Sequence, residues 1–245
     1  MSRLRLTILI VLAMLAFAGN SLLCRLALQN TVIDAASFTA LRLASGALTL
    51  WMIARRRPTA RVSGGDWLSA FALFGYAAGF SFAYARLTAA TGALLLFGAV
   101  QATMIGCGLW SRERLVTLQA IGFLLAFAGL VSFLLPGLSA PSIRGTLLML
   151  GAGVAWGIYS LRGRRAGSPI NVTAGNFLRA VPLALALSLI TLSRASIDGA
   201  GFWFAIASGT LTSGIGYAIW YAALPALQAV QAASVQLSVP VIAAV

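Results

Sequence analysis

Histidine and lysine are both absent from this sequence of 245 residues, and only four residues are acidic. The acids lie far apart, at Asp34, Asp66, Glu113 and Asp198, and the two cysteines have no metal-ligand spacing. A zinc or iron site therefore lacks ligands, and a catalytic triad built on histidine is impossible. We expect no metal, no cofactor and no enzymatic activity. A membrane-embedded enzyme acting on lipid is the weaker alternative, because it would have no obvious general base.

Charge of either sign is scarce: 9% of the residues are charged, 60% are apolar, and the mean hydropathy is +0.96. A soluble domain with so little charge could not cover its surface. Because a spanning helix needs about 20 mostly apolar residues, the sequence predicts an all-α integral membrane protein. The predicted spans are Leu6–Leu28, Ala36–Ala54, Trp67–Ala85, Thr88–Leu109, Leu118–Leu135, Gly145–Leu161, Val172–Leu192, Gly201–Tyr221 and a ninth from Ala226.

The beginning of the chain allows two interpretations. Two arginines, an apolar stretch and Ala16-Phe17-Ala18 resemble a secretory signal with its cleavage site. The apolar segment, however, continues past that point to about Leu28, and its pattern returns later in the chain. We therefore expect an uncleaved first span.

The net charge of +13 comes entirely from arginine, and the 17 arginines lie mostly in short clusters between apolar runs. Such clusters are typical of a topology signal, and no basic face interleaved with aromatic residues predicts nucleic-acid binding. With the N-terminus in the cytoplasm, 11 arginines lie inside and 3 outside, which sets the orientation. Arg25, Arg42 and Arg179 fall within the spans.

An internal repeat appears when the chain is shifted against itself by 137 residues. Arg25 then meets Arg162, Arg42 meets Arg179, Gly79 meets Gly216, and Tyr84 meets Tyr221. The sequence thus predicts two units, residues 1–136 and 137–245. Because each unit has an odd number of spans, five, the second copy would enter the membrane from the opposite side, as in inverted-repeat transporters.

The repeat also predicts that the second unit is incomplete. Val245 corresponds to Gly108, whereas the first unit continues through a charged turn and a fifth span to about Leu135. We expect nine spans of a complete ten, which leaves a truncated, non-transporting membrane protein as an alternative function.

These features resemble the EamA-type permeases of the drug/metabolite transporter superfamily. The resemblance rests on the two units, the arginine in the second span of each, Ala155-Trp156-Gly157, and Arg112-Glu113-Arg114 after the fourth span. It implies a bundle of ten helices in a 5+5 inverted repeat, with a central cavity. It also implies export of small metabolites, such as amino-acid-like compounds, across the bacterial inner membrane. A proline common in the fourth span is absent, while its equivalent, Pro240, is present.

Candidate cavity residues are the polar and aromatic side chains within spans. An arginine in the bilayer usually faces a bundle interior or a wet cavity and suits an anion, although it can also reach a helix end. Buried Trp and Tyr need a polar partner, and amides or hydroxyls either join helices or recognise substrate. The candidates are Asn20, Ser21, Arg42, Phe80, Gln101, Trp156, Tyr159, Arg179, Tyr217 and Gln236. The expected partners are a small-molecule substrate and the lipid bilayer, and a monomer is compatible with the sequence.

Overall fold

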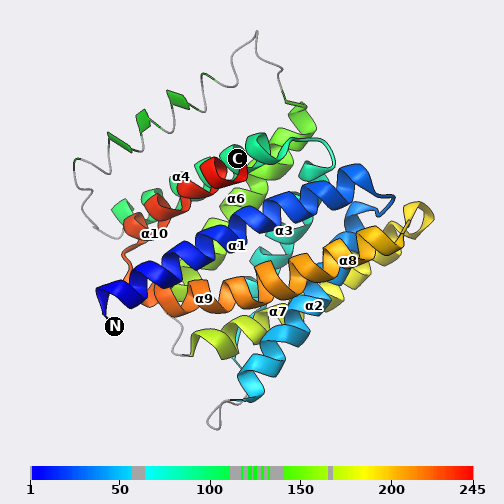
Figure 1. Ribbon diagram of the computed structural model, residues 1–245, viewed down its shortest axis with the longest axis horizontal. Helices are drawn as coiled ribbons and strands as arrows, with labels where there is room; N and C mark the ends of the chain where they lie inside the picture. Colours follow the sequence, from blue (N-terminus) through cyan, green and yellow to red (C-terminus); the bar gives the residue numbers. More distant parts are fainter. Residues whose placement is uncertain are drawn as a thin grey trace.

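The computed structural model describes residues 2–56, 64–110, 141–164 and 168–244, with isolated helical positions between 117 and 132. The described residues form helices and no strand. The longer helices are α1 (Arg3–Asn30), α2 (Ala35–Arg55), α3 (Trp67–Tyr84), α4 (Ala89–Trp110), α6 (Ile143–Arg164) and α7 (Pro169–Ile190). The shorter elements are η1 (Leu192–Arg194), α8 (Gly199–Ala207), η2 (Ser208–Ile215), α9 (Gly216–Ala223), η3 (Leu224–Ala226), α10 (Ala229–Gln236) and α11 (Ser238–Ala244). Together they form an all-α membrane helix bundle (Figure 1).

Six helical stretches are long and apolar enough to cross a membrane: α1, α2, α3, α4, α7 and the continuous run Gly199–Ala226. They correspond to six of the predicted spans. The predicted span Gly145–Leu161 is α6, a helix of 22 residues that packs against α3 and α4. The last predicted span is a shorter apolar helical stretch, Ala229–Ala243.

Some predicted features fall outside the described residues. They are the fifth span, Leu118–Leu135, apart from its isolated helical positions, the turn Arg112-Glu113-Arg114, and the arginines at 57, 61 and 165.

Local sequence explains where several helices begin. Asp34 precedes α2 and accepts hydrogen bonds from the backbone N–H groups of Ala36 and Ser37, at 2.9 and 3.0 Å. Asp66 precedes α3 and accepts the Ser69 N–H at 2.9 Å. A carboxylate at this position satisfies N–H groups that have no partner within the helix, and it complements the helix dipole.

The shift by 137 residues relates α1 to α6, α3 to the run from α8 to α9, and α4 to α10 and α11. Related helices make related contacts. α3 packs against α6 as the run from α8 to α9 packs against α1, and α4 packs against α6 as α11 packs against α1. α2 and α7 pack against each other. This correspondence is the pattern expected of the repeat, while the unit boundaries at residues 136 and 137 stay a prediction.

Equivalent helices also run in opposite directions. Arg25, near the end of α1, donates to the Tyr84 carbonyl oxygen at the end of α3 (3.0 Å). Arg162, near the end of α6, is paired with Asp66 at the start of α3 (2.9 Å). α1 therefore runs in the same direction as α3, whereas α6 runs in the opposite direction, so that α1 and α6 are antiparallel to each other (Figure 1).

Small residues allow these helices to approach closely. A methyl group built at Gly79 of α3 would lie 3.2 Å from the Cβ of Ala152 on α6. The repeat-related Gly216 of α9 is even closer to α1, since a methyl group there would lie 2.7 Å from the Cβ of Ala16. Both glycines lie in helix interfaces, where small residues are favoured in membranes.

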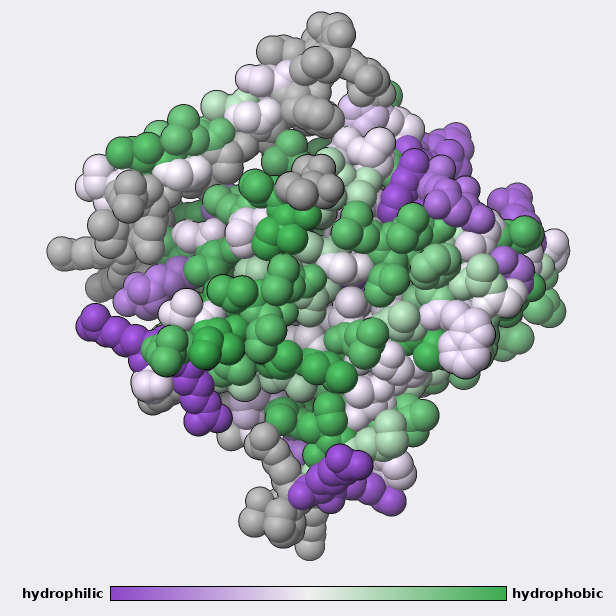
Figure 2. All heavy atoms as spheres, in the orientation of Figure 1, coloured by the Kyte–Doolittle hydropathy of each residue, from purple (hydrophilic) through white to green (hydrophobic). Residues whose placement is uncertain are grey.

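The outer surface is apolar over a broad area. Figure 2 shows hydrophobic residues across the middle of the visible face and hydrophilic ones gathered toward its edges. On α1 the large exposed apolar side chains are Leu4, Ile8, Val11, Leu12, Leu15, Leu22 and Leu26. Such a continuous apolar surface is stable against lipid and not against water.

One end of the bundle is closed by a clasp between two loops, which we define as residues 31–34 and 195–198. The backbone N–H groups of Asp34 and Ser196 donate reciprocally, to the Ser196 carbonyl oxygen and the Asp34 carboxylate, each at 3.0 Å. The Ser196 hydroxyl donates to the Val32 carbonyl oxygen. Partial burial works to raise the pKa of Asp34, but hydrogen bonds from Ser37, Ser196 and Ala36 outweigh it and hold that pKa below its ordinary value.

Candidate functional site

The centre of the bundle holds a network of hydrogen bonds around Asn20. Its amide nitrogen donates to the Tyr76 hydroxyl of α3 at 3.2 Å. The Ser208 hydroxyl of η2 donates to its amide oxygen at 2.7 Å, and the Thr212 hydroxyl lies 3.0 Å from the same oxygen. All four side chains are buried. One neutral amide therefore joins three helical segments from both halves of the chain.

A second buried hydrogen bond joins α6 to α10. The indole N–H of Trp156 donates to the Gln236 side-chain oxygen at 2.8 Å, and the Gln236 amide nitrogen donates to the Ala232 carbonyl oxygen at 2.9 Å. Gln236 is the last residue of α10 because Pro240 follows four residues later. Proline lacks an N–H and clashes with the carbonyl group four residues earlier, so the helix is interrupted at this residue.

Aromatic rings fill the space between these two polar groups. Trp156 lies 4.8 Å from Tyr217, 4.9 Å from Tyr76 and 5.4 Å from Phe17, measured between ring centroids. Tyr159, one turn further along α6, lies 5.8 Å from Trp156. We call these five aromatic residues, with Asn20 and Gln236, the central cluster.

The central cluster is closed in this structure. A cavity of only about 10 Å³ remains beside it, lined by Phe17, Ser21, Tyr76, Phe80, Leu96, Phe97 and Trp156. That volume is about the minimum that holds a single water molecule. A molecule larger than water can occupy this position only after the surrounding rings have moved apart.

Arg42 of α2 lies against the same rings. Its guanidinium carbon is 5.4 Å from the centroid of Tyr76 and 5.0 Å from that of Phe80, and the residue is 1% exposed. Rings at these distances attract a cation. The structure thus places Arg42 beside Phe80 and the central cluster, and its role in binding a substrate stays a prediction.

Arg179, the equivalent of Arg42 in the repeat, is placed differently. It donates to the carbonyl oxygens of Gly64 and Gly175, at 3.0 and 2.9 Å, at the end of the bundle where α3 begins. It stabilises a connection between helices, and its predicted place in a cavity lining stays a prediction. Gln101 is buried in α4, but none of the described hydrogen bonds joins it to the central cluster.

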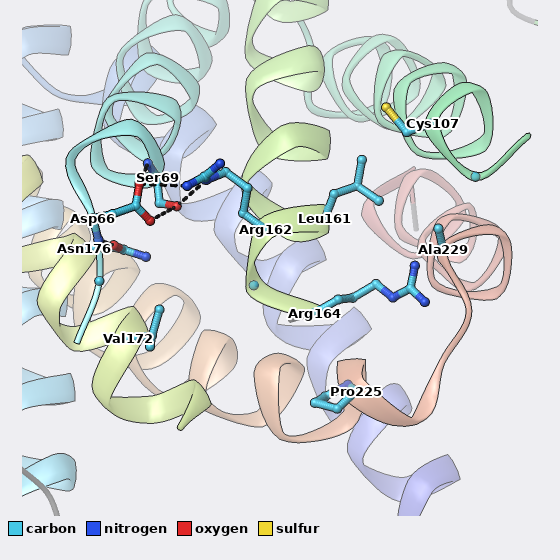
Figure 3. A pocket seen from close by; sticks show the side chains of 13 residues that line it. Asp66, Ser69, Cys107, Leu161, Arg162, Arg164, Val172, Asn176, Pro225 and Ala229 are labelled. Atoms are coloured by element: carbon cyan, nitrogen blue, oxygen red, sulfur yellow. Dashed lines mark hydrogen bonds and ion pairs between the residues drawn. The ribbon is translucent and has the colours of Figure 1, made fainter. Parts of the chain in front are cut away.

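A much larger cavity, of about 630 Å³, opens at the end of the bundle opposite the clasp. It lies where α4 and α6 end and where α3, α7 and α10 begin (Figure 3). Its lining includes Asp66, Ser69, Cys107, Arg162, Arg164 and Asn176. Trp156 lies six residues before Arg162 on α6, so the central cluster is about 9 Å deeper along the helix axis.

An ion pair is present in the lining of this cavity. Arg162 lies 2.9 Å from the Asp66 carboxylate and 2.8 Å from the Ser69 hydroxyl (Figure 3). Partial burial works to raise the pKa of Asp66, but the hydrogen bonds from Ser69 and the guanidinium of Arg162 outweigh it and hold that pKa below its ordinary value. Both side chains are nearly half exposed, so the pair adds little stability.

Sequence analysis missed four residues of this region: Phe17, Tyr76, Ser208 and Thr212. The available signals were spacings of four residues, between Tyr76 and Phe80 and between Ser208 and Thr212, each of which places two side chains on one helix face.

Tyr84 and Tyr221 are fully buried between helices, although tyrosine in a spanning helix often lies at the lipid–water interface. Their positions are therefore structural, within the bundle.

The comparisons with known proteins agree with this architecture. Residues 143–245 match the EamA-like transporter family. The chain is 60% identical over 242 residues to an uncharacterized protein, PA1977, of Pseudomonas aeruginosa, an alignment that covers 98% of this chain and 84% of that protein. It is 29% identical over 168 residues to an uncharacterized transporter of Archaeoglobus fulgidus, covering 64% of this chain and 57% of the other.

A solved crystal structure of a protein shares the fold. It has 22% sequence identity and a TM-score of 0.78, and the match covers 99% of this chain and 86% of the other. From the family match, the extensive similarity to the Pseudomonas protein and the bundle of apolar helices, we conclude that the chain belongs to the EamA-like transporter family and is a multi-pass membrane transporter of the drug/metabolite transporter type.

Proposed function

We propose that this transporter exports small metabolites across the bacterial inner membrane by alternating access, with its N-terminus in the cytoplasm. The observation that carries the proposal is the difference between the two ends of the described bundle. A cavity of about 630 Å³ opens at one end, while at the other end the clasp of Asp34 and Ser196 joins two loops by hydrogen bonds. Among the described residues, the end with this cavity carries Arg55, Arg56, Arg162 and Arg164, which the topology rule assigns to the cytoplasm.

In this proposal, the substrate enters the large cavity and moves to the central cluster. The polar groups that meet it there are the amides of Asn20 and Gln236, and the rings of Phe80, Trp156 and Tyr217 contact its apolar part. Ser21 adds a buried hydroxyl without a hydrogen-bond partner beside the same small cavity. Since these residues come from helices of both halves, rocking of one half against the other would open the cluster to either side.

The test is efflux of metabolites from vesicles that contain the purified chain. A panel of small metabolites is loaded, and their release is compared with that from empty vesicles. We expect release of at least one compound, and roughly tenfold slower release for Gln236→Leu, because the substitution leaves the Trp156 N–H unpaired, at a cost of about 1–3 kcal/mol.

The control for that variant is Ser238→Ala. The Ser238 hydroxyl is exposed and donates to the Val235 carbonyl oxygen, three residues earlier in the chain. It should release the compound at the wild-type rate. The proposal fails if no compound leaves the protein-containing vesicles faster than it leaves the empty ones.

A further inference from the structure

Arg42 is the one buried charged side chain among the residues that the structure describes. It lies eight residues into α2, and its exposure of 1% means that it does not extend to the water at the helix end. A charged group held inside a membrane bundle is costly, and it normally pairs with another group or serves a function.

The guanidinium of Arg42 has no counterion among the described residues. Two of its nitrogens, Nε and Nη1, are buried without a hydrogen-bond partner. The described acids are engaged elsewhere: Asp34 in the clasp, Asp66 with Arg162, and Asp198 at the start of α8. The rings of Tyr76 and Phe80 attract the cation through their faces, but they accept no hydrogen bond from these nitrogens.

We infer that Arg42 binds the carboxylate of the transported metabolite, and that the substrates are therefore organic anions with an apolar body. This inference rests on the proposed transport function. The site lacks a countercharge and hydrogen-bond acceptors for the guanidinium, and a carboxylate supplies both. Arginine also pairs with carboxylates especially well, because its planar group can form two parallel hydrogen bonds to them.

The surroundings define the rest of the substrate. Tyr76 and Phe80, which hold the guanidinium, also line the small cavity together with Phe17 and Trp156. An aromatic or aliphatic body attached to the carboxylate would therefore contact these rings. The nearby polar groups, Asn20 and Gln236, are neutral, and no described acid lies there to pair with an ammonium group. The site consequently prefers a simple monocarboxylate to a zwitterion or a cation.

Binding is tested with the purified full chain in detergent, by the rise in melting temperature at increasing ligand concentration. The probes are 3-phenylpropanoate, its neutral amide 3-phenylpropanamide, the zwitterion phenylalanine, and hexanoate. We expect the two carboxylates without an ammonium group to stabilise the protein, and the amide to bind at least tenfold more weakly.

Arg42→Gln should abolish the response to 3-phenylpropanoate, whereas Arg55→Gln should retain it. Arg55 is the matched control, because it lies on the same helix and also contacts a ring, that of Trp51, but at the exposed end. Without ligand, Arg42→Gln should melt at or above the wild-type temperature, because it removes an uncompensated buried charge. If Arg42→Gln gives no folded protein, the rise in melting temperature with 3-phenylpropanoate is compared between Arg42→Lys and Arg55→Lys. The inference then expects a weaker response from Arg42→Lys, and an equal response from the two variants would contradict it.

Three results would overturn the inference: a response that Arg42→Gln retains, an equal response to the amide, or the same Arg42-dependent response to chloride alone. The efflux assay separates this inference from the proposed function. Release of neutral or cationic compounds at a rate that Arg42→Gln leaves unchanged would refute the anion site and leave transport established. Arg42-dependent binding without any efflux would refute transport and leave the site.

Discussion

A single amide, that of Asn20, connects three helical segments at the centre of this protein. It donates to Tyr76 of α3 and accepts from Ser208 and Thr212 of η2. All four side chains are buried, so the Asn20 amide depends on these hydroxyls for its hydrogen bonds, while the Thr212 hydroxyl also reaches the Ser208 carbonyl oxygen at 2.7 Å. Asn20 is consequently a structural link between these segments.

Replacing Asn20 with alanine should destabilise the protein by about 2 kcal/mol, because three buried hydroxyls lose a partner. The measurement is the melting temperature of the purified chain, with Thr7→Ala as the control. Thr7 lies on the same helix, but its hydroxyl is exposed and bonds to the Arg3 carbonyl oxygen. Equal melting temperatures for the two variants would show that the Asn20 network contributes nothing to stability.

At the scale of elements, η2 is the unusual segment. Residues Ser208–Ile215 form a wider, π-helical stretch within an otherwise α-helical run, a feature frequent at functional sites. The stretch contains Gly209, which packs directly against α2 at the Arg42 carbonyl group and the Ser45 hydroxyl. This contact sets the distance between η2 and the helix that carries Arg42.

Gly209→Ala should therefore lower stability by about 1–3 kcal/mol, because its new methyl group would overlap backbone atoms of α2. Gly151→Ala on α6 is the matched control, since a methyl group there meets nothing within 4 Å. The control should match or slightly exceed the wild type, because alanine favours a helix over glycine. Thermal unfolding in detergent compares the two, and equal losses would contradict the packing at Gly209.

At the scale of the whole molecule, the two ends of the described bundle differ. The clasp closes the end where α1 and α7 finish, and Leu87 packs over Gly145 at the start of α6 on that side. At the opposite end, the large cavity contains Cys107. The two native cysteines differ in their access to reagents, because Cys107 is exposed and Cys24 is buried in α1.

A membrane-impermeant maleimide should therefore label only Cys107, and only from the cytoplasmic side. Inside-out vesicles should react, right-side-out cells should not, and Cys107→Ser should abolish the labelling of the inside-out vesicles. Mass spectrometry of the labelled chain identifies the modified cysteine. Labelling of Cys107 from outside the cell would contradict the proposed orientation. Labelling of Cys24 would contradict its burial in α1.

The sequence determined the helices and much of their arrangement. Hydropathy located the apolar runs that form the helices. It could do so because each spanning segment must by itself avoid the cost of placing charged groups in lipid. The shift by 137 residues predicted that equivalent helices would occupy equivalent positions, and Gly79 and Gly216 do lie in matching interfaces. Asn20, Trp156 and Gln236 could be chosen as candidates because polar side chains in an apolar run need partners.

Only the tertiary structure decided which of those candidates meet. Arg42 and Arg179 are equivalent in the repeat, yet Arg42 lies against Tyr76 and Phe80, whereas Arg179 bonds to backbone carbonyl groups. Tyr84 is buried although its type suits the interface. The physical reason is that a partner comes from the helix lying opposite, often more than 100 residues away, and that neighbour depends on how the whole bundle packs.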